Sequence, residues 1–291
     1  MRDFLSHRAK NIKPSGIRRF FDIVSERRDV ISLGVGEPDF ITPWEIRDAG
    51  IGAVKKGYTQ YTSNSGLKTL REDISEYLKA RFSVEYKSDD IVITVGASEA
   101  IDATLRAVVN EGDEVLIPDP SYVSYQPCVE LLGGKPVSVP CDGKDGFKLT
   151  PENLEKVITD KTKILIFPYP NNPTGGIMEK EYIEKIIPVI LKYDLLVISD
   201  EIYAELTYGV KHQSIGRHAL TCSPSAMRAM GQSASGLGSR TVEEGERSFA
   251  VSAMKRTPQK TMSSALASRA LIESSRESPV KSARSWISGR T

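Results

Sequence analysis

Polar groups that could bind a ligand follow two expected strands of this sequence. Asn171-Asn172 comes after the apolar run Ile164–Phe167, and Asp200 comes after a second apolar run, Leu195–Ile198. Because ligands of open parallel sheets bind at the carboxyl ends of the strands, these residues are expected to form two walls of a site. The turn Gly96–Ala100 lies between an expected strand and a helix, and its free backbone N–H groups are suited to phosphate. Such turns also occur with nothing bound, so this turn alone is a weak indication.

A helix is expected to connect the two apolar runs. Residues 168–176 form a turn cluster with three prolines and a glycine pair. Apolar residues then recur at helical spacing at Ile183, Ile186, Ile187, Ile190 and Leu191. Pro188 is expected to kink or split this helix. A strand–helix–strand crossover implies that the two strands are parallel.

Strands and helices alternate from about residue 67 to residue 203, which predicts an α/β sheet of mainly parallel strands. Strands are expected over 91–95, 114–117 and 136–140, the last an edge strand bounded by prolines. Helices are expected over 17–24, 67–82, 97–109 and 151–158, the last with Thr150 as its N-cap.

Composition favours a soluble cytoplasmic protein without nucleic-acid or membrane partners. The chain has 291 residues and a formal net charge of +1, which offers no electrostatic attraction to polyanions. Cys128, Cys141 and Cys222 are far apart and predict neither a disulfide framework nor a zinc site. The N-terminus has no apolar signal core, and no run approaches the roughly 20 apolar residues of a membrane span.

Two loops have a plain structural explanation when the residues are taken alone. Gly34 and Gly36 begin a dinucleotide-like pattern, but the third glycine is absent and Glu37-Pro38-Asp39 follows, so a turn is favoured. Tyr61 stands in a polar loop, residues 57–66, where it could simply pack beneath the loop.

The composition changes abruptly at about Leu220. The 72 residues from Leu220 to Thr291 contain 16 serines and no Asp, Asn, Tyr or His. A stretch with so little to bury resists forming a packed core. It is expected to be a disordered, low-complexity tail, and the favoured explanation is a wrong reading frame or a fused foreign piece. Resequencing codons 215–222 tests this explanation, and an unbroken frame shared with close relatives would contradict it.

Six motifs occur in an order and spacing that resemble the class I/II aminotransferases, which are pyridoxal-phosphate enzymes of fold type I. They are GVGEPDF, YTQYTSNSG followed by LKTLRE, VGASEAI, PDPSY, YPNNPTG and SDEIY. The resemblance covers roughly residues 10–215. It implies the large domain of that fold, with a mainly parallel sheet flanked by helices and incomplete at the C-terminus.

The resemblance also implies roles for individual residues. Asp200 would form an ion pair with the protonated ring nitrogen that makes the cofactor an electron sink. Asn172 and Tyr203 would hydrogen-bond to its phenolic oxygen, and Tyr122 would stack on the ring. The phosphate would bind the N–H groups of Ala97 and Ser98.

Substrate and subunit contacts are implied in the same way. Tyr61 would reach the phosphate of a neighbouring subunit, which implies a homodimer with shared sites. Gly36 would lie beside the substrate carboxylate, and Asn172 would contact the substrate too. The substrates would be an amino acid and a 2-oxo acid.

One departure from the family's pattern concerns the catalytic residue. The family uses a lysine in a serine-rich motif, some thirty-odd residues after the aspartate, to form a Schiff base and to move a proton. That window reads GQSASGLGSRTV, and no lysine occurs between Lys211 and Lys255. Lys255 has neither the motif nor the spacing, so no Schiff-base lysine is assigned. Arg240 is a weak match to the arginine that follows that lysine.

The sequence therefore predicts a transaminase by family, with two alternatives. One is a related chemistry on the same scaffold, such as a C–S lyase or decarboxylase; the other is a non-catalytic fragment that binds cofactor weakly. A transcription regulator is disfavoured because no helix-turn-helix fits ahead of the motifs. The expected domains are an N-terminal arm with part of a small domain (1–45), an incomplete cofactor-binding large domain (46–219) and the tail (220–291).

Overall fold

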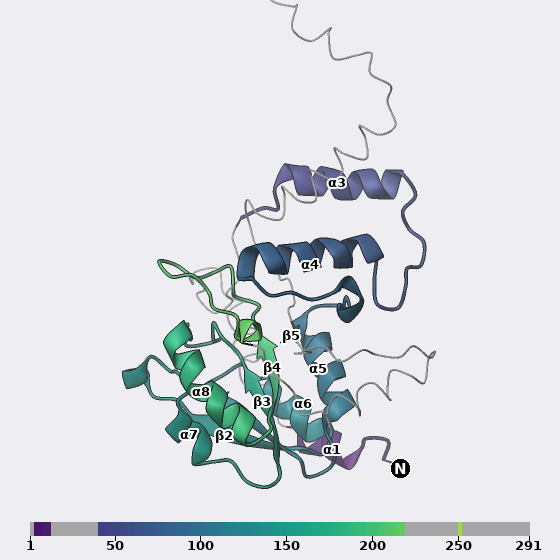
Figure 1. Cartoon of the computed structure of the whole chain (residues 1–291). Coiled ribbons are helices and arrows are strands. Elements are labelled where there is room, and N and C mark those ends of the chain that lie inside the picture. The colour runs from purple at the N-terminus through teal and green to yellow at the C-terminus, as the bar shows by residue number, and fades with distance from the viewer. Residues whose placement is uncertain (1–2, 13–39, 219–249, 252–291) are drawn as a thin grey trace, which may run out of the picture. The chain divides into compact units, whose positions relative to one another are not determined.

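A parallel sheet forms the core of the computed structural model, which describes residues 3–12, 40–218 and 250–251 (Figure 1). The strands lie in the order β2-β1-β3-β4-β5, and every neighbouring pair is parallel. Their bounds are β1 (Glu114–Asp119), β2 (Lys135–Pro140), β3 (Thr162–Phe167), β4 (Leu196–Asp200) and β5 (Ala250–Val251). The predicted parallel α/β sheet is confirmed, as is the edge position of β2.

The helices expected over 67–82 and 97–109 are confirmed, the helix expected over 151–158 ends at Glu155, and the helix expected over 17–24 lies outside the described residues. Within the described residues they are α1 (His7–Asn11), α3 (Trp44–Lys55), α4 (Lys68–Phe82), α5 (Ala97–Val108), α6 (Tyr125–Leu131), α7 (Pro151–Glu155) and α8 (Lys180–Lys192), with short 3₁₀ turns at Ser88–Asp90, Gly143–Asp145 and Ile215–Arg217. Thr150 caps α7 as expected, since its hydroxyl accepts from the Asn153 N–H at 3.2 Å.

Both faces of the sheet are covered by helices. Leu116 and Leu165 point to one face and pack with residues of α7 and α8. Val115 and Ile164, their neighbours in sequence, point to the other face and pack with residues of α5 and α6. Figure 1 shows the two helical layers on either side of the strands. Strands buried on both faces need apolar residues at every position, which explains the continuous apolar runs.

Helix α8 is continuous through Pro188, so of the two expected effects of this proline, a kink or a split, the split is wrong. The helix continues to Lys192 with Pro188 inside it. Pro188 is exposed, and so is Glu184, whose carbonyl lacks a donor because proline has no N–H. That carbonyl therefore lies on the solvent side, where water can bind it. Meanwhile Ile183 and Ile190 are buried on the opposite face and hold both halves of the helix to the sheet.

The strand expected over residues 91–95 is wrong. This segment belongs to no strand, and Val92 and Val95 are 62% and 91% exposed. A run of β-branched residues becomes a strand only where a neighbouring strand accepts its hydrogen bonds, and the described part of the chain supplies none there.

The described residues belong to two compact units. The first holds 3–12, 65–218 and 250–251, and the second holds 40–64 with α3. Within the second unit, α3 has no buried residue. The three-part division at residues 45 and 219 stays a prediction. After residue 219 only β5 is described, and its backbone pairs with Ser199 and Asp200, in a stretch where the sequence suggested no strand.

Candidate active site

Asp200, the last residue of β4, is a buried carboxylate at the carboxyl edge of the sheet, with an exposed fraction of 5%. The Tyr125 hydroxyl donates to Oδ2 at 2.8 Å, and the Ile202 backbone N–H donates to Oδ1 at 3.2 Å. Both donors are neutral, and no cationic side chain of the described residues pairs with Asp200. Burial raises the pKa of Asp200, and the hydrogen bond from Tyr125 opposes that rise. A buried carboxylate in these surroundings is suited to a cationic ligand.

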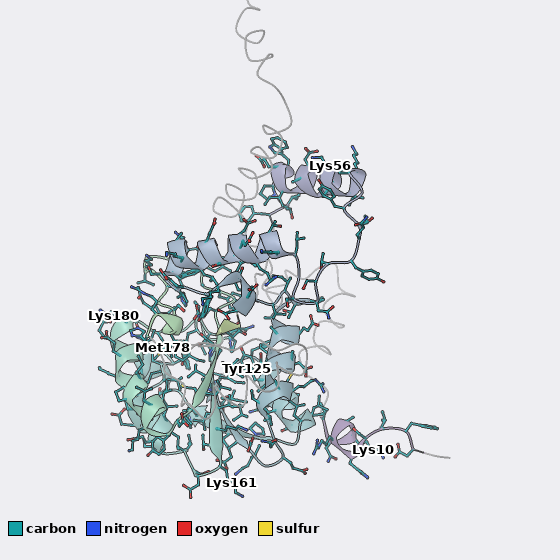
Figure 2. The ribbon with its side chains drawn as sticks, turned by 45° about the vertical axis from the view of Figure 1, so that its right-hand side comes forward. Lys10, Lys56, Tyr125, Lys161, Met178 and Lys180 are labelled. Carbon is teal, nitrogen blue, oxygen red and sulfur yellow. The ribbon has the colours of Figure 1, made fainter. Side chains whose placement is uncertain are left out.

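Tyr125 connects Asp200 with Tyr122. It is the first residue of α6, it is 3% exposed, and its ring meets that of Tyr122 edge to face at 5.6 Å between centroids. Burial, with the charge of Asp200, raises the pKa of Tyr125, so the hydroxyl keeps its proton and stays a donor. Figure 2 shows Tyr125 in the interior beside the strands, whereas Lys161 and Lys180 lie at the surface.

Sequence reasoning selected Tyr122 and missed Tyr125. The available signal was spacing, because residues three apart in a helical turn lie on the same side. Spacing alone could not show which of the two tyrosines reaches Asp200, since that depends on where α6 packs against β4.

The two asparagines in the turn after β3 have different surroundings. Asn171 is buried, and its Oδ1 accepts from Thr174 Oγ1 at 3.1 Å, while its N–H donates to the Gly176 carbonyl at 2.9 Å. The Asn171 side chain therefore holds the turn together. Asn172 is only half-buried, and no hydrogen bond of its amide is recorded within the described ranges. Its side chain is free to bind a ligand.

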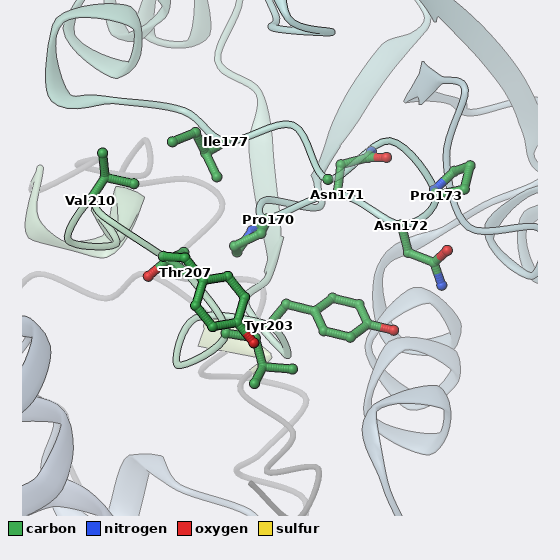
Figure 3. Close-up of a pocket in the computed structure, with 11 residues that line it drawn as sticks. Pro170, Asn171, Asn172, Pro173, Ile177, Tyr203, Thr207 and Val210 are labelled. Atoms are coloured by element: carbon green, nitrogen blue, oxygen red, sulfur yellow. The ribbon is translucent and has the colours of Figure 1, made fainter. Parts of the chain in front are cut away.

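Asn172 and Tyr203 line one cavity of about 430 Å³. Figure 3 shows the asparagine–proline turn along one wall, with Tyr203, Thr207 and Val210 along the other. None of the lining residues is charged at neutral pH.

The N-terminus of α5 is the turn that was predicted to bind a phosphate. Its N-cap is Gly96 at φ 85°, which no side chain caps, so the N–H groups of Ala97 and Ser98 point out of the helix without a capping partner. Glu99 folds back to accept from the Val95 N–H. Ser98 is exposed and Ala97 is half-buried, so a ligand can reach this turn.

Other predicted site residues are not placed with this cluster. Gly36 and Arg240 lie outside the described residues. Tyr61 belongs to the second unit, where its side chain is fully exposed.

Ser121, next to Tyr122, was not predicted, yet its hydroxyl is buried and has no hydrogen-bond partner among the described residues. In the same part of the chain no group of three acidic, histidine or cysteine residues could hold a metal, and no helix could cross a membrane.

The family model for "Aminotransferase class I and II" matches residues 28–284. The chain belongs to this family. The match reaches beyond residue 219, into the stretch that was expected to be foreign.

Individual relatives agree with the family. The chain is 49% identical over 216 residues to the putative aminotransferase YugH of Bacillus subtilis, covering 74% of this chain and 56% of the relative. It is 46% identical to an aspartate aminotransferase of Pyrococcus abyssi, and the match covers 72% of this chain and 55% of the relative. Among solved structures, the aromatic aminotransferase of Pyrococcus horikoshii matches with TM-score 0.64 and 44% identity. This match covers 68% of this chain and 53% of the solved chain. The chain thus spans about half the length of these relatives.

Members of this family use pyridoxal phosphate, and the described residues fit that molecule. Its protonated ring nitrogen matches the buried carboxylate of Asp200, to which only neutral groups of the described residues donate. Its phenolic oxygen matches the unengaged amide of Asn172 and the hydroxyl of Tyr203. Its phosphate matches the uncapped end of α5. The fit covers the non-covalent binding groups and not the lysine.

Proposed function

We propose that this chain is a pyridoxal-phosphate aminotransferase by function, acting on an amino acid and a 2-oxo acid. The observation that carries the proposal is the buried Asp200 carboxylate, whose donors among the described residues are neutral and whose pKa is raised by burial. The family of the chain supports the same chemistry. The named relatives include aspartate and aromatic enzymes, so the proposal extends to the class of amino acids and not to one donor.

When bound, pyridoxal phosphate supplies an electron sink for the charge left on the α-carbon of an amino acid. Asp200 would hold a proton at the ring nitrogen, since its buried negative charge favours a cation beside it. Tyr125 would keep the carboxylate in place by its hydrogen bond. Tyr122 would cover the ring.

Asn172 and Tyr203 would orient the other edge of the ring by hydrogen bonds to the phenolic oxygen. The N–H groups of Ala97 and Ser98 would hold the phosphate at the positive end of the α5 dipole. Gly36 would lie beside the substrate carboxylate, and Asn172 would also contact the substrate. Tyr61 would reach the phosphate of a neighbouring subunit, in a cytoplasmic homodimer.

A second candidate is a non-catalytic protein that binds the cofactor without a covalent bond. The observation that favours it is the absence of lysine between Lys211 and Lys255. The two candidates share the binding groups and differ in whether a lysine reacts with the cofactor.

Cofactor binding is tested by titrating the purified chain with pyridoxal phosphate and measuring the bound fraction by equilibrium dialysis. The variant Asp200→Asn removes the charge that would pair with the ring nitrogen. Its affinity should fall about 30-fold or more, as for truncation of one partner of a buried charge pair.

The matched control is Asp113→Asn at the opposite edge of the sheet, where the carboxylate pairs with Lys163 at 2.7 Å. Its affinity should equal that of the wild type. Equal affinity of Asp200→Asn and wild type would contradict the proposal. Borohydride treatment of the complex then separates the two candidates: a single modified lysine supports the enzyme, and none supports the non-covalent binder.

A further inference from the structure

Tyr203 stands on a segment that leaves the sheet after β4, residues 201–214. Two turns shape it: the Ala204 N–H donates to the Glu201 carbonyl at 2.9 Å, and the Leu206 N–H donates to the Tyr203 carbonyl at 2.8 Å. Isolated turns of this kind open readily in water, because few residues share the cost of ordering them. A fixed place for Tyr203 in the cavity wall therefore requires contacts from elsewhere.

These contacts come from α4. Glu205, two residues after Tyr203, accepts from Arg81 in a two-point pair, with Nε–Oε1 and Nη2–Oε2 both at 2.7 Å. Tyr77, one helical turn before Arg81, donates its hydroxyl to the same Oε1 at 2.6 Å. Three charge-assisted hydrogen bonds thus join one face of a 15-residue helix to this carboxylate.

We call the hydrogen bonds from Arg81 and Tyr77 to Glu205 the α4 clamp. Its groups keep their ionisation states at neutral pH. The Arg81 guanidinium holds the pKa of Glu205 below its usual value, so the carboxylate stays ionised. Burial, with the Glu205 hydrogen bond, raises the pKa of Tyr77, so the phenol keeps the proton that it donates. The Glu205 side chain is 18% exposed, which limits screening of the pair by water and salt.

Other contacts fix the ends of the segment. The buried Glu201 carboxylate accepts from Ser199 and Ser214 at 2.8 Å each and lies 2.9 Å from His212 Nε2. These contacts connect the first residue of the segment, Glu201, to its last residues, His212 and Ser214. The α4 clamp acts on the middle, where Tyr203 faces the cavity.

We propose that Arg81 and Tyr77 are positioning residues for Tyr203 and act through Glu205. Helix α4 would thereby set the place of a cofactor-binding side chain through a carboxylate two residues along the chain. The inference rests on the proposed function, because the place of Tyr203 affects binding only if Tyr203 binds the cofactor.

A double-mutant cycle on cofactor affinity tests the coupling. Arg81→Met removes the guanidinium and keeps the length of the side chain, and it should weaken binding of pyridoxal phosphate between about threefold and thirtyfold. In the Tyr203→Phe background, where the hydroxyl to be positioned is gone, Arg81→Met should change affinity by less than about twofold. Arg81→Lys should recover part of the affinity, since it restores the charge and not the two-point geometry.

The control is Lys163→Met, which breaks an ion pair of the same length and similar exposure at the opposite edge of the sheet: 2.7 Å, with side chains 40% and 23% exposed against 47% and 18% for Arg81 and Glu205. It should leave affinity unchanged in both backgrounds. An Arg81→Met effect that is equal with and without the Tyr203 hydroxyl would overturn the proposal, and so would an effect no larger than that of the control.

Hydrogen exchange separates this proposal from the proposed function, because it needs no cofactor. The Ala204 and Leu206 amides should exchange about tenfold faster in Arg81→Met and unchanged in Lys163→Met. If wild type does not bind pyridoxal phosphate, the proposed function fails, while faster exchange in Arg81→Met alone still supports the clamp. Unchanged exchange in Arg81→Met overturns the clamp whatever the cofactor does.

Discussion

Two buried carboxylates at opposite ends of the sheet have contrasting surroundings. Glu114, at the start of β1, is 3% exposed and accepts from Lys135 at 2.8 Å and from two threonine hydroxyls at 2.6 and 3.0 Å. Asp200, at the end of β4, is 5% exposed, and its two donors in the described part of the chain are neutral. The Lys135 ammonium lowers the pKa of Glu114, whereas burial raises the pKa of Asp200.

The contrast distinguishes a carboxylate that stabilises the fold from one that serves a ligand. Glu114 joins β1 to β2, to the start of β3 and to Thr159 just before it, and each of these partners belongs to the chain. Asp200 lowers stability while it is ionised, because its charge is desolvated and no described residue supplies a cation beside it. Perturbed groups of this kind cluster at functional sites.

The largest change in stability is expected at Tyr125, which makes the side-chain hydrogen bond to Asp200. Tyr125→Phe removes a hydrogen bond to a buried charge and should lower the free energy of unfolding by about 2 kcal/mol. Tyr169→Phe is the matched control, since that buried hydroxyl donates to the neutral Phe147 carbonyl at 2.9 Å, and its cost should be about 1 kcal/mol. Urea unfolding of both variants measures the difference; a larger cost at Tyr169 would contradict the role given to Tyr125.

At the structural end, Glu114→Gln should lower the free energy of unfolding by about 1.5 kcal/mol. The amide keeps the size of the side chain but loses the charge that holds Lys135, and its N–H₂ group faces two hydroxyls that now have to accept. Cofactor affinity should not change. Denaturant unfolding and dialysis measure the two effects, and a stable variant would show that the Glu114 cluster is dispensable.

At the carboxyl end of the strands, where the ligand would bind, the change in the free energy of unfolding should have the opposite sign. Asp200→Asn removes a desolvated charge and should raise the free energy of unfolding of the cofactor-free chain by about 1 kcal/mol, since its oxygen can still accept a hydrogen bond. The same variant should lose cofactor affinity. Thermal unfolding without ligand tests this, and destabilisation comparable to that of Glu114→Gln would remove the distinction between the two ends.

The smallest expected effects concern pH: Glu114 and Asp200 should make the free energy of unfolding change with pH in opposite directions. Glu114 has a lowered folded pKa, so its contribution is present above its usual value of 4.5 and is lost as pH falls through the folded pKa. Asp200 has a raised folded pKa, so stability falls as pH rises from its usual 3.8 through the folded value. Each substitution should remove its own slope from a curve of unfolding free energy against pH. A curve that neither substitution alters would contradict both assignments.

Much of the fold was predictable because the local signals agreed. The period of the apolar residues defined α4 and α8, and continuous apolar runs defined β1, β3 and β4. The strand expected over 91–95 failed because a strand depends on a partner that a local pattern does not include. Pro188 failed to split α8 for a similar reason, since burial of the opposite helix face outweighed one lost hydrogen bond.

The site was predictable where a motif places a residue at a strand end, as for Asp200, or in a turn, as for Asn172. Tyr125 and Glu205 were not, because their importance lies in contacts with partners 75 and 124 to 128 positions away in the sequence. Nothing in the local pattern around Glu205 marks Arg81 as its partner.

By itself, the sequence determined the order of the elements, the family, and which residue types stand at the carboxyl edge of the sheet. It also showed that the window for a reactive lysine contains none. Only the tertiary structure decided which tyrosine holds Asp200, which asparagine is free for a ligand, and how α4 clamps the segment that carries Tyr203. The physical reason is that periodicity and motifs act over a few residues, whereas burial and charge pairing depend on chain segments that meet only after folding.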